Sequence, residues 1–204
     1  AAAQVDVTFN TFSDNQYSVL ILSANQISNI LRNTFDIDNG RMYSNRVSII
    51  QLDSLSTNRT IIDANTFNVS NVRQSGGEVL GDNVPTPAIY VSHLNENVTR
   101  GRSSVLVSNN RFNLESPDSV TMWFEDTDSG VISGNTFSGE LTSDDPGTEA
   151  NLVLYLENKD FSNNVDGWTI VDNNFSALTY CSGFIGSATI NTIVGPNQDC
   201  NLLD

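Results

Sequence analysis

The chain has 204 residues, which suits one domain with a substantial buried core. Its 24 acidic residues against 9 basic ones give a net charge of −15, and such a surface repels nucleic acid, whose phosphates need clustered lysine and arginine. No run of about 18 or more apolar residues occurs, so the sequence predicts no membrane span.

The first predicted strand lies in VDVTFNTF, where an aliphatic residue stands three positions before an asparagine and a phenylalanine two positions after it. This spacing occurs six times along the chain. The aliphatic residues are Val7, Ile30, Ile62, Val107, Ile132 and Ile170; the asparagines are Asn10, Asn33, Asn65, Asn110, Asn135 and Asn173; the phenylalanines are Phe12, Phe35, Phe67, Phe112, Phe137 and Phe175. We predict a strand ending in Asn-x-Phe at each copy, with a turn at the asparagine, because asparagine tolerates left-handed backbone angles.

A second family of predicted strands alternates with the first. These segments are rich in β-branched and aromatic residues and are bounded by turn-forming residues. They lie at 17–23, 46–52, 87–94, 119–125, 151–157 and, more loosely, 183–190. Successive asparagines are 23, 32, 45, 25 and 38 residues apart, so a unit of about 23 residues is lengthened by inserts at 36–45, 68–86, 94–103, 138–149 and 158–166.

A two-strand unit of this length cannot bury its own apolar face, but it can do so when stacked on copies of itself. Stacking would place neighbouring strands in parallel, ~4.8 Å apart, with the phenylalanines in one column and the aliphatic residues in another. The asparagines would then form a ladder of amide hydrogen bonds. The sequence therefore predicts an all-β solenoid of about six coils with loop insertions.

This pattern resembles the right-handed parallel β-helix (pectate-lyase-like) superfamily, in which an aliphatic-x-x-Asn-x-aromatic coil repeat is common. The resemblance covers residues from about 5 to 195 and implies a single-stranded right-handed parallel β-helix, with 1–204 as a single domain. The superfamily includes polysaccharide lyases, glycoside hydrolases, epimerases, tailspikes, adhesins and surface-layer proteins. The alternative fold is a β-sandwich, whose strands would recur every 8–12 residues or so, as these roughly do.

The catalytic signatures of that superfamily are missing from the sequence. Its hydrolase motifs and its Asp-Pro-His-Glu epimerase motif are absent, and the Asn-Thr-Phe of four repeats supplies no carboxylate. The single histidine, His93, stands at a strand end beside a loop, and we expect an ordinary surface residue. No catalytic residue is assigned from the sequence, which leaves enzymatic activity open but disfavoured.

An acidic turn after the 119–125 strand is the best candidate for a cation site. EDTDSG supplies Glu125, Asp126 and Asp128 before Gly130, and alternating oxygens followed by glycine can wrap Ca²⁺. A similar run, DIDNG, occurs at 36–40. Neither run reaches the full calcium-loop spacing, so solvated turns are the alternative interpretation. Calcium is the one cofactor that the sequence suggests.

Sequons, cysteines and a near absence of lysine point to an extracellular or cell-surface protein. The four N-glycosylation sequons are at Asn58, Asn68, Asn97 and Asn174. Cys181 and Cys200 could close a disulfide loop that stabilises the fold by about 3 kcal/mol in the chain-entropy model. We therefore expect a glycoprotein with covalently bound glycans and one disulfide.

The two ends of the predicted solenoid differ. Residues from about 181 to 204 are expected to cap the C-terminal end, whereas QVDVTF begins directly with a strand. The first coil would belong to a longer chain or be covered by another subunit. The sequence thus favours a structural subunit of a filament, sheath or adhesin that assembles through uncovered end coils or strand exchange. The alternatives are a polysaccharide-degrading β-helix of lyase, hydrolase or tailspike type, and a sugar- or cation-binding module.

Overall fold

The structure, a computed structural model, describes part of the chain. The described residues are 3–13, 20–23, 26–38, 41–42, 49–53, 59–70, 73–74, 88–92, 104–115, 121–125, 130–139, 154–157, 165–178, 182–185, 189–190, 193–195 and 201–203. All regular secondary structure in these ranges is β-strand, and every pair of hydrogen-bonded strands is parallel. In the same ranges, no helix has the length and apolar character that crossing a membrane would need.

Three long sheets contain nearly all of these strands. The first sheet has the order β1 (Ala3–Thr8), β4 (Gln26–Leu31), β8 (Arg59–Asp63), β12 (Ser104–Ser108), β15 (Gly130–Ser133), β19 (Trp168–Val171) and β23 (Ile193–Val194). The second has the order β2 (Thr11–Ser13), β5 (Thr34–Asp38), β9 (Thr66–Ser70), β13 (Arg111–Glu115), β16 (Thr136–Gly139) and β20 (Asn174–Leu178).

The third sheet pairs the strands that follow the first two sheets along the chain. Its order is β3 (Leu20–Ser23), β7 (Ile50–Asp53), β11 (Ile89–Ser92), β14 (Met122–Glu125), β17 (Leu154–Glu157), β21 (Ser182–Ile185) and β24 (Asn201–Leu203). Two short pairs complete the set: β6 (Arg41–Met42) with β10 (Arg73–Gln74), and β18 (Val165–Asp166) with β22 (Thr189–Ile190).

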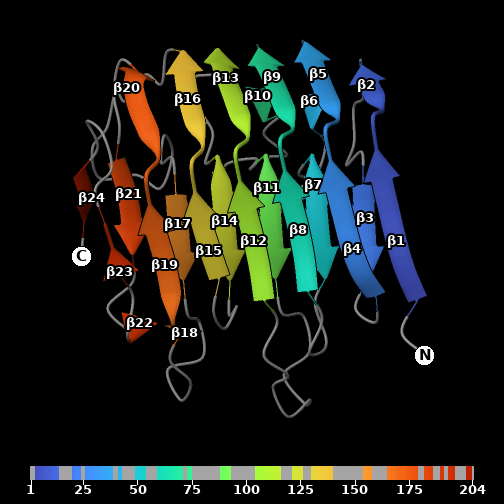
Figure 1. Cartoon of the computed structure of the whole chain (residues 1–204). Helices are drawn as coiled ribbons and strands as arrows, with labels where there is room; N and C mark the ends of the chain where they lie inside the picture. The colour runs from blue at the N-terminus through green and yellow to red at the C-terminus, as the bar shows by residue number, and fades with distance from the viewer. Residues whose placement is uncertain are drawn as a thin grey trace.

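The chain visits the three long sheets in turn and returns to the first one strand further along. Figure 1 shows the first sheet in front, the second continuing above it and the third behind, with the N-terminus at one side and the C-terminus at the other. Strands of one sheet therefore come from successive segments of sequence, in order, and the repeat along the chain becomes a repeat across each sheet.

The strand boundaries differ from those that the sequence predicts. The repeat predicts one strand that ends at Asn-x-Phe. In the structure the first-sheet strand of each of the six repeats ends two residues before the asparagine, and a strand of the second sheet begins directly after it. The phenylalanine of the motif thus belongs to a further strand, so each unit has three strands in the long sheets where the sequence predicts two.

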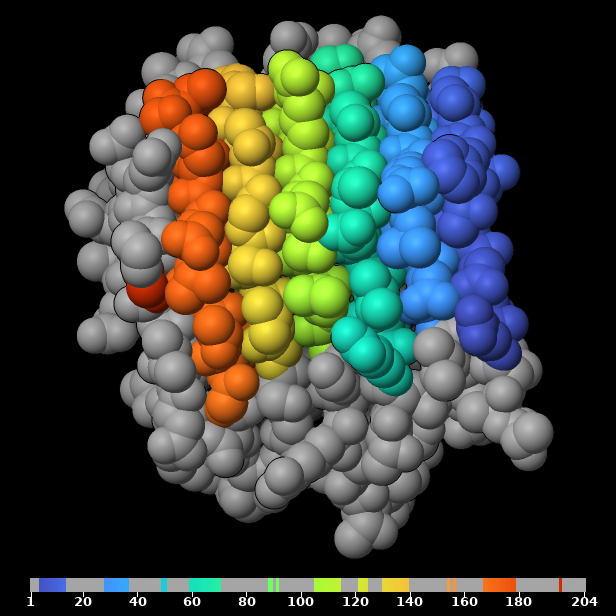
Figure 2. Space-filling view, in the orientation of Figure 1, coloured from blue at the N-terminus to red at the C-terminus, as the bar shows by residue number. Residues whose placement is uncertain are grey.

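All three sheets contribute to one hydrophobic cluster, which contains Ile30 of the first sheet, Phe35 of the second and Ile50 of the third. The aliphatic position of the repeats is buried throughout from Ile30 to Ile170. Burying one such side chain contributes about 1.5–3 kcal/mol relative to leaving it exposed. In the space-filling view of Figure 2 the successive repeats form parallel bands in chain order, each in contact with the next.

The segment expected as a C-terminal cap, about 181–204, includes four short strands among its described residues. β21 and β24 extend the third sheet, β23 extends the first, and β22 pairs with β18. The C-terminal end of the described structure therefore adds parallel strands to the existing sheets.

Candidate functional site

The six asparagines of the repeats form a ladder of side-chain hydrogen bonds; we number the repeats 1 to 6 after Asn10, Asn33, Asn65, Asn110, Asn135 and Asn173. In each neighbouring pair, Oδ1 of the later asparagine accepts from the backbone N–H of the earlier one (2.9–3.1 Å) and from its Nδ2 (2.9–3.2 Å). Nδ2 of the later asparagine also donates to the carbonyl of the aliphatic residue one repeat earlier (2.8–3.0 Å).

These bonds explain how amide side chains can lie in the core. The asparagines of repeats 2 to 6 are buried beside the aliphatic residues. Leaving a buried amide donor or acceptor without a partner costs about 1–3 kcal/mol. In repeats 2 to 5 the Oδ1 accepts two hydrogen bonds and the Nδ2 donates two, so burial leaves none of the side chain's main bonding capacity unused.

The phenylalanines form a second column in the same register. The ring centroids of consecutive phenylalanines lie 4.6–5.1 Å apart, and their planes differ by 6–19°. This spacing matches the ~4.8 Å separation of paired strands. Each stacked pair contributes about 0.5–1.5 kcal/mol beyond the burial of its area. A shift of register would break both columns at once, so they fix how the strands of the second sheet pair.

A left-handed residue makes the corner in every repeat. It is the residue just before the asparagine, and all six copies are exposed with positive φ: Phe9 (57°), Arg32 (57°), Ala64 (55°), Asn109 (53°), Gly134 (64°) and Asp172 (57°). In repeats 1 to 5 its backbone N–H bonds a carbonyl of the next repeat at 3.1–3.3 Å. The turn expected at the asparagine is therefore displaced by one residue, because the asparagine itself faces the core while the residue before it turns the chain.

Repeat 1 differs from the others because no described strand lies outside it. Asn10 is exposed and Phe12 is only half-buried, whereas the corresponding residues of repeats 2 to 6 are buried. Asn10 donates to Thr8 and Asn33, but its own Oδ1 accepts no hydrogen bond from a described residue. The first rung of the ladder thus presents an acceptor and an aromatic ring at an open edge.

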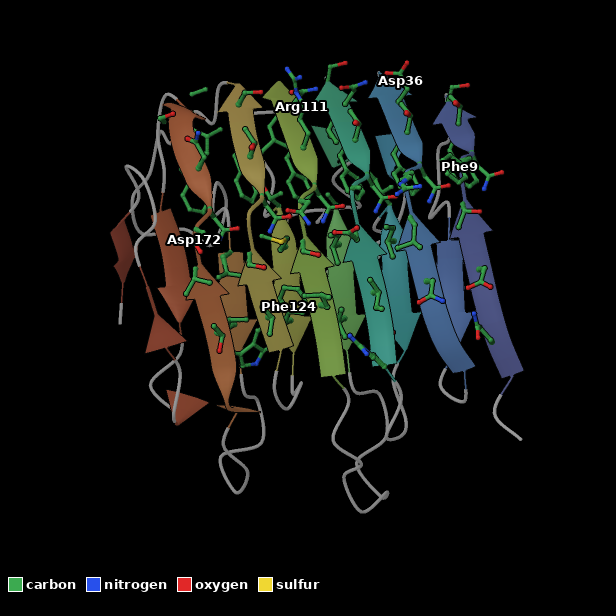
Figure 3. The ribbon with its side chains drawn as sticks, viewed as in Figure 1. Phe9, Asp36, Arg111, Phe124 and Asp172 are labelled. Carbon is green, nitrogen blue, oxygen red and sulfur yellow. The ribbon has the colours of Figure 1, made fainter. Side chains whose placement is uncertain are left out.

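Phe9 adds an aromatic side chain to the same edge. It is 71% exposed, the one large hydrophobic side chain in the described structure that is exposed. The Arg32 guanidinium carbon lies 5.4 Å from its ring centroid, a cation–π contact. Figure 3 shows Phe9 at the outer edge of the molecule, at the corner between β1 and β2.

A hydrogen-bonded carboxylate lies on the outer face of the same edge. Asp6 accepts two bonds of 2.9 Å from Gln4 Nε2 and one of 2.6 Å from Asn29 Nδ2. The hydrogen bond from Gln4, followed by that from Asn29, lowers the pKa of Asp6 from its usual 3.8. The carboxylate is thus held in its ionised form at the edge of the first sheet.

The outer face of the second sheet has two polar rows in register across the strands. The row next to the asparagine is Thr11, Thr34, Thr66, Arg111 and Thr136, and the row two residues further on is Ser13, Asp36, Asn68, Asn113 and Ser138. Asp36 and Arg111 are labelled in Figure 3 near the upper end of this sheet. A period of two residues places both rows on the same side of the sheet.

Part of this face is a groove of ≈ 390 Å³ at the ends of β9, β13 and β16. Three side chains of its lining are hydrogen-bonded: Asn113 Nδ2 donates to Asn68 Oδ1 (2.6 Å), and Ser138 Oγ donates to Asn113 Oδ1 (2.8 Å). Arg111 Nε also donates to Asn113 Oδ1 (3.0 Å). No described residue accepts from Asn68 Nδ2, so amide and guanidinium donors remain free to meet a ligand with oxygen acceptors.

The sequence-predicted site residues fall into three groups. The ladder residues lie together, as described above. Two sequon asparagines are described: Asn68 lies in the groove, and Asn174 begins β20, where its Oδ1 accepts from the N–H (3.0 Å) and Oγ (2.6 Å) of Ser176. Glu125 is the last residue of β14. The rest of the predicted cation, glycan and disulfide positions lie outside the described residues: Asp126, Asp128, Asn58, Asn97, Cys181 and Cys200.

A metal site is not among the features that the structure brings together. In the described part of the chain, no three His, Cys, Asp or Glu side chains gather at one point. The candidate calcium turn stays a prediction, because two of its three carboxylates lie beyond that part.

Sequence reasoning missed three features. The left-handed corner residue had a partial signal, since Asn109, Gly134 and Asp172 are types that tolerate positive φ. The polar outer rows had one in the threonine that follows the asparagine in four repeats. A further copy of the spacing, from Val194 to Asn197, lacks the phenylalanine and so escapes a search for the whole motif; Val194 pairs with Ile170, and Asn197 lies outside the described residues.

Comparison with known protein families, with curated proteins and with solved structures found no match to this chain.

Proposed function

We propose that the chain is a right-handed parallel β-helix of the pectate-lyase-like type, with about six coils. The order in which the strands enter the three sheets supports this, since each return to a sheet lands beside the previous strand and parallel to it. Crossover connections between parallel strands of one sheet are right-handed in about 98% of cases, which favours the right-handed form.

The function proposed for this fold is structural: an extracellular subunit of a surface filament, sheath or adhesin that assembles through an uncovered end coil. The observation that supports it is the exposure of repeat 1 in the described structure. Asn10 Oδ1 and one face of the Phe12 ring have the chemistry that repeats 2 to 6 use to bond a neighbour, but here that chemistry is exposed. An exposed parallel strand edge is a template for adding a further strand.

Concentration-dependent assembly tests this function. Sedimentation velocity of the purified chain should reveal growing oligomers as its concentration rises, and electron microscopy should reveal rods that lengthen along one axis. Material that stays monomeric at every concentration would contradict the filament function.

The extracellular setting has its own test. We propose N-glycans on the four sequons and a disulfide between Cys181 and Cys200. The free Nδ2 of Asn68 and the exposure of neighbouring Ser176 beside Asn174 support the first part. Peptide mass spectrometry of the protein from its native source should find glycan mass and a cystine-linked peptide; free thiols and unmodified asparagines throughout would place the protein in a reducing compartment.

A second candidate function is the binding, or degradation, of a polysaccharide in the groove on the second sheet. The free donors of Asn68 and the guanidinium of Arg111 favour a ligand with many oxygen acceptors. Asn113→Ala should weaken binding of an acidic polysaccharide about tenfold, the effect of losing roughly one hydrogen bond, while Thr34→Ala, on the same outer face but outside the groove, should not. Equal affinities of the wild type and Asn113→Ala in a titration, together with no release of reducing ends from the polysaccharide, would exclude this function.

Calcium at Glu125, Asp126 and Asp128 is proposed as a stabilising ion. Adding CaCl₂ should raise the melting temperature of the wild type and leave that of Asp126→Asn unchanged. An equal rise in both proteins, or with MgCl₂ and CaCl₂ alike, would assign the effect to general screening of the acidic surface.

A further inference from the structure

The outer face of the first sheet has an apolar row across three neighbouring strands. Ile61 of β8, Leu106 of β12 and Val131 of β15 pair in register, and all three are half-buried. The next residue of each strand is the buried aliphatic position of its repeat, so the period of two residues places the row on the opposite, outer side. Leu31 of β4 and Val171 of β19 extend the apolar surface to the strands on either side. Figure 2 shows this face, with the strands of successive repeats side by side.

Two opposite charges flank the apolar row on β8. Arg59 stands two residues before Ile61 and Asp63 two residues after it, so all three share the outer face. Arg59 is exposed, and no described residue accepts a hydrogen bond from its guanidinium. Asp63 Oδ1 accepts from Ser108 Oγ (2.6 Å) and Asn109 Nδ2 (2.9 Å), while no described residue donates to Oδ2. A cation and a positioned carboxylate therefore lie at equal distances on either side of the row.

A two-fold axis along the apolar row makes this face complementary to itself. Two copies related by that axis stack their first sheets face to face with antiparallel strands, as sheets do in a sandwich. Each residue of the row then faces its own equivalent, and Arg59 of each copy faces Asp63 of the other. An axis along the strand direction would leave every residue at its own level of the strand, so Arg59 would never face Asp63. Charge complementarity thus selects the first arrangement.

We infer that the outer face of the first sheet is a docking surface for the same face of a second copy of this chain, across a two-fold axis that follows Ile61, Leu106 and Val131. The contact covers the apolar row and pairs Arg59 with Asp63 twice. It is a side-by-side contact, separate from the end-coil assembly proposed above. Because a contact of this symmetry uses the same surface on both copies, it closes at a dimer.

The contact should be weak. The five strands from β4 to β19 span about 24 Å, and five residues of a strand span about 17 Å. Such a face buries less than the roughly 1,200–2,000 Å² of a standard stable interface. Asp6 lies in the same row, since it pairs with Asn29 and Asn29 pairs with Ile61, and it would face its own equivalent across the axis. We therefore expect a dissociation constant above about 1 μM.

Charge reversal at Arg59 tests the contact. In sedimentation equilibrium from about 1 μM to 1 mM, Arg59→Glu should raise the dissociation constant at least about tenfold, because two carboxylates then face each other in both halves of the interface. Arg59→Lys keeps the charge and should associate like the wild type. Thr136→Glu adds a carboxylate on the outer face of the second sheet and should change the dissociation constant by less than about threefold. Melting temperatures verify that the variants are folded.

A mixing experiment tests the two-fold axis. Asp63→Lys should weaken association as Arg59→Glu does, but a mixed pair of these variants has opposite charges in both contacts. Native mass spectrometry of the mixture should therefore detect the mixed dimer in excess over either variant's own dimer. Arg59→Glu mixed with wild type keeps one native contact, so its affinity should lie between those of the two parent dimers, and this arm does not require Asp63→Lys to fold. Mixed dimers that form no better than the Arg59→Glu dimer would overturn the inference.

Asp6 provides a test of opposite sign. Asp6→Asn removes the like charges that face each other on the axis, so it should strengthen dimerisation by about threefold. Weaker association of this variant would place the axis elsewhere and would contradict the inference.

The remaining outcomes separate this contact from the structural function proposed above. A wild type that stays monomeric over the whole concentration range overturns the inference. Larger oligomers that Arg59→Glu leaves unchanged also overturn it, while the structural function stands. A dimer that Arg59→Glu weakens, with no larger species, supports the contact and contradicts the filament function.

Discussion

At the scale of single residues, the asparagine is the most demanding position of each repeat. Asparagine is the one polar side chain that is buried in the core at regular intervals. It can be buried because its amide has both donors and an acceptor at its tip. A leucine has the same branched shape but would leave the backbone N–H of one neighbour and the carbonyl of another without partners. Hydrogen bonding therefore explains this position better than packing does.

Replacing a buried asparagine of the ladder should lower the stability of the protein. Asn110→Ala removes the acceptor of Asn65 N and Nδ2, the donor to Ile62 O and a donor to Asn135 Oδ1. We expect a loss of about 3 kcal/mol in the free energy of unfolding, measured by urea denaturation. Asn10→Ala, at the exposed end of the ladder, is the control and should cost about 1 kcal/mol or less. Equal losses for the two variants would show that burial of the ladder is not the source of its stability.

At the corner position, replacing alanine by glycine and glycine by alanine should change the stability of the protein in opposite directions. Ala64 has a φ of 55°, which costs an L-residue roughly 1–2 kcal/mol, so Ala64→Gly should stabilise the protein by about 0.5 kcal/mol after its extra unfolded-state entropy is counted. Gly134→Ala should destabilise it by about 1–2 kcal/mol, since a Cβ there would also lie 2.8 Å from Asn109 Oδ1. Thermal unfolding of both variants provides the measurement; shifts of the same sign would refute the assignment of the corner.

The carboxylate of Asp6 should respond to its two donors. Because the folded-state pKa of Asp6 is lowered, its stabilising contribution is present above the ordinary pKa of 3.8 and is lost as the pH falls through the lowered value. Gln4→Ala, which removes the larger cause, should raise the pKa of Asp6 towards 3.8 in an NMR titration. Asn29→Ala should raise it by a smaller amount, and the opposite order would contradict the hydrogen-bond geometry.

At the scale of elements, packing between strands of neighbouring repeats decides which residue each position tolerates. Gly130 of β15 lies beside Trp168 of β19 in the register of the first sheet, and the indole ring is fully buried. A Cβ at Gly130 would lie 2.5 Å from the Trp168 ring. The glycine therefore makes room for the largest side chain in the core, which also contacts Phe124 of the third sheet at 4.7 Å between ring centroids.

Enlarging this glycine should destabilise the protein through the tryptophan. We expect Gly130→Ala to lower the free energy of unfolding by about 1–3 kcal/mol, as overpacking of a filled core does. Ser133→Ala, on the same strand, is the control and should have a small effect. In the double variant Gly130→Ala with Trp168→Phe, the losses should be less than additive, as chemical denaturation can measure. Strict additivity would mean that the two positions do not interact.

At the scale of the whole molecule, the acidic charge opposes the compact state. The chain has 24 acidic and 9 basic residues, and stacking brings segments from the whole sequence together. Self-repulsion of a net charge of −15 is screened by salt, with a Debye length of about 10 Å at 0.1 M. The same repulsion acts between copies in the assembly proposed above, so salt should favour both folding and association.

Stability should therefore rise with ionic strength. The melting temperature should increase between about 0.01 M and 0.2 M NaCl and then level off as screening saturates. KCl should give the same curve, because the effect depends on ionic strength and not on the cation. A melting temperature that falls with salt would indicate that attractive ion pairs outweigh the repulsion.

The all-β class and the columns of like residues follow from the sequence because their causes are repeated six times. Any one copy, such as Ile132 with Asn135 and Phe137, is a weak signal, but stacking requires the same residue types at every level. The corner was harder to place: Ala64 and Arg32 have side chains that do not prefer positive φ. Their conformation is imposed by hydrogen bonds to the next repeat, which the local sequence does not encode.

By itself, the sequence determined the repeating chemistry: an aliphatic residue, an amide and a ring at constant spacing, each of which needs a partner of its own kind. Burial and hydrogen bonding act on residue type, so this much can be read from the chain. Only the tertiary structure decided that the unit has three strands, that Asn68 and Asn113 share a groove, and that no described residue donates to Asn10 Oδ1. These features depend on which segments become neighbours, and residues 45 positions apart, such as Asn68 and Asn113, meet only after the intervening chain has closed its path through all three sheets.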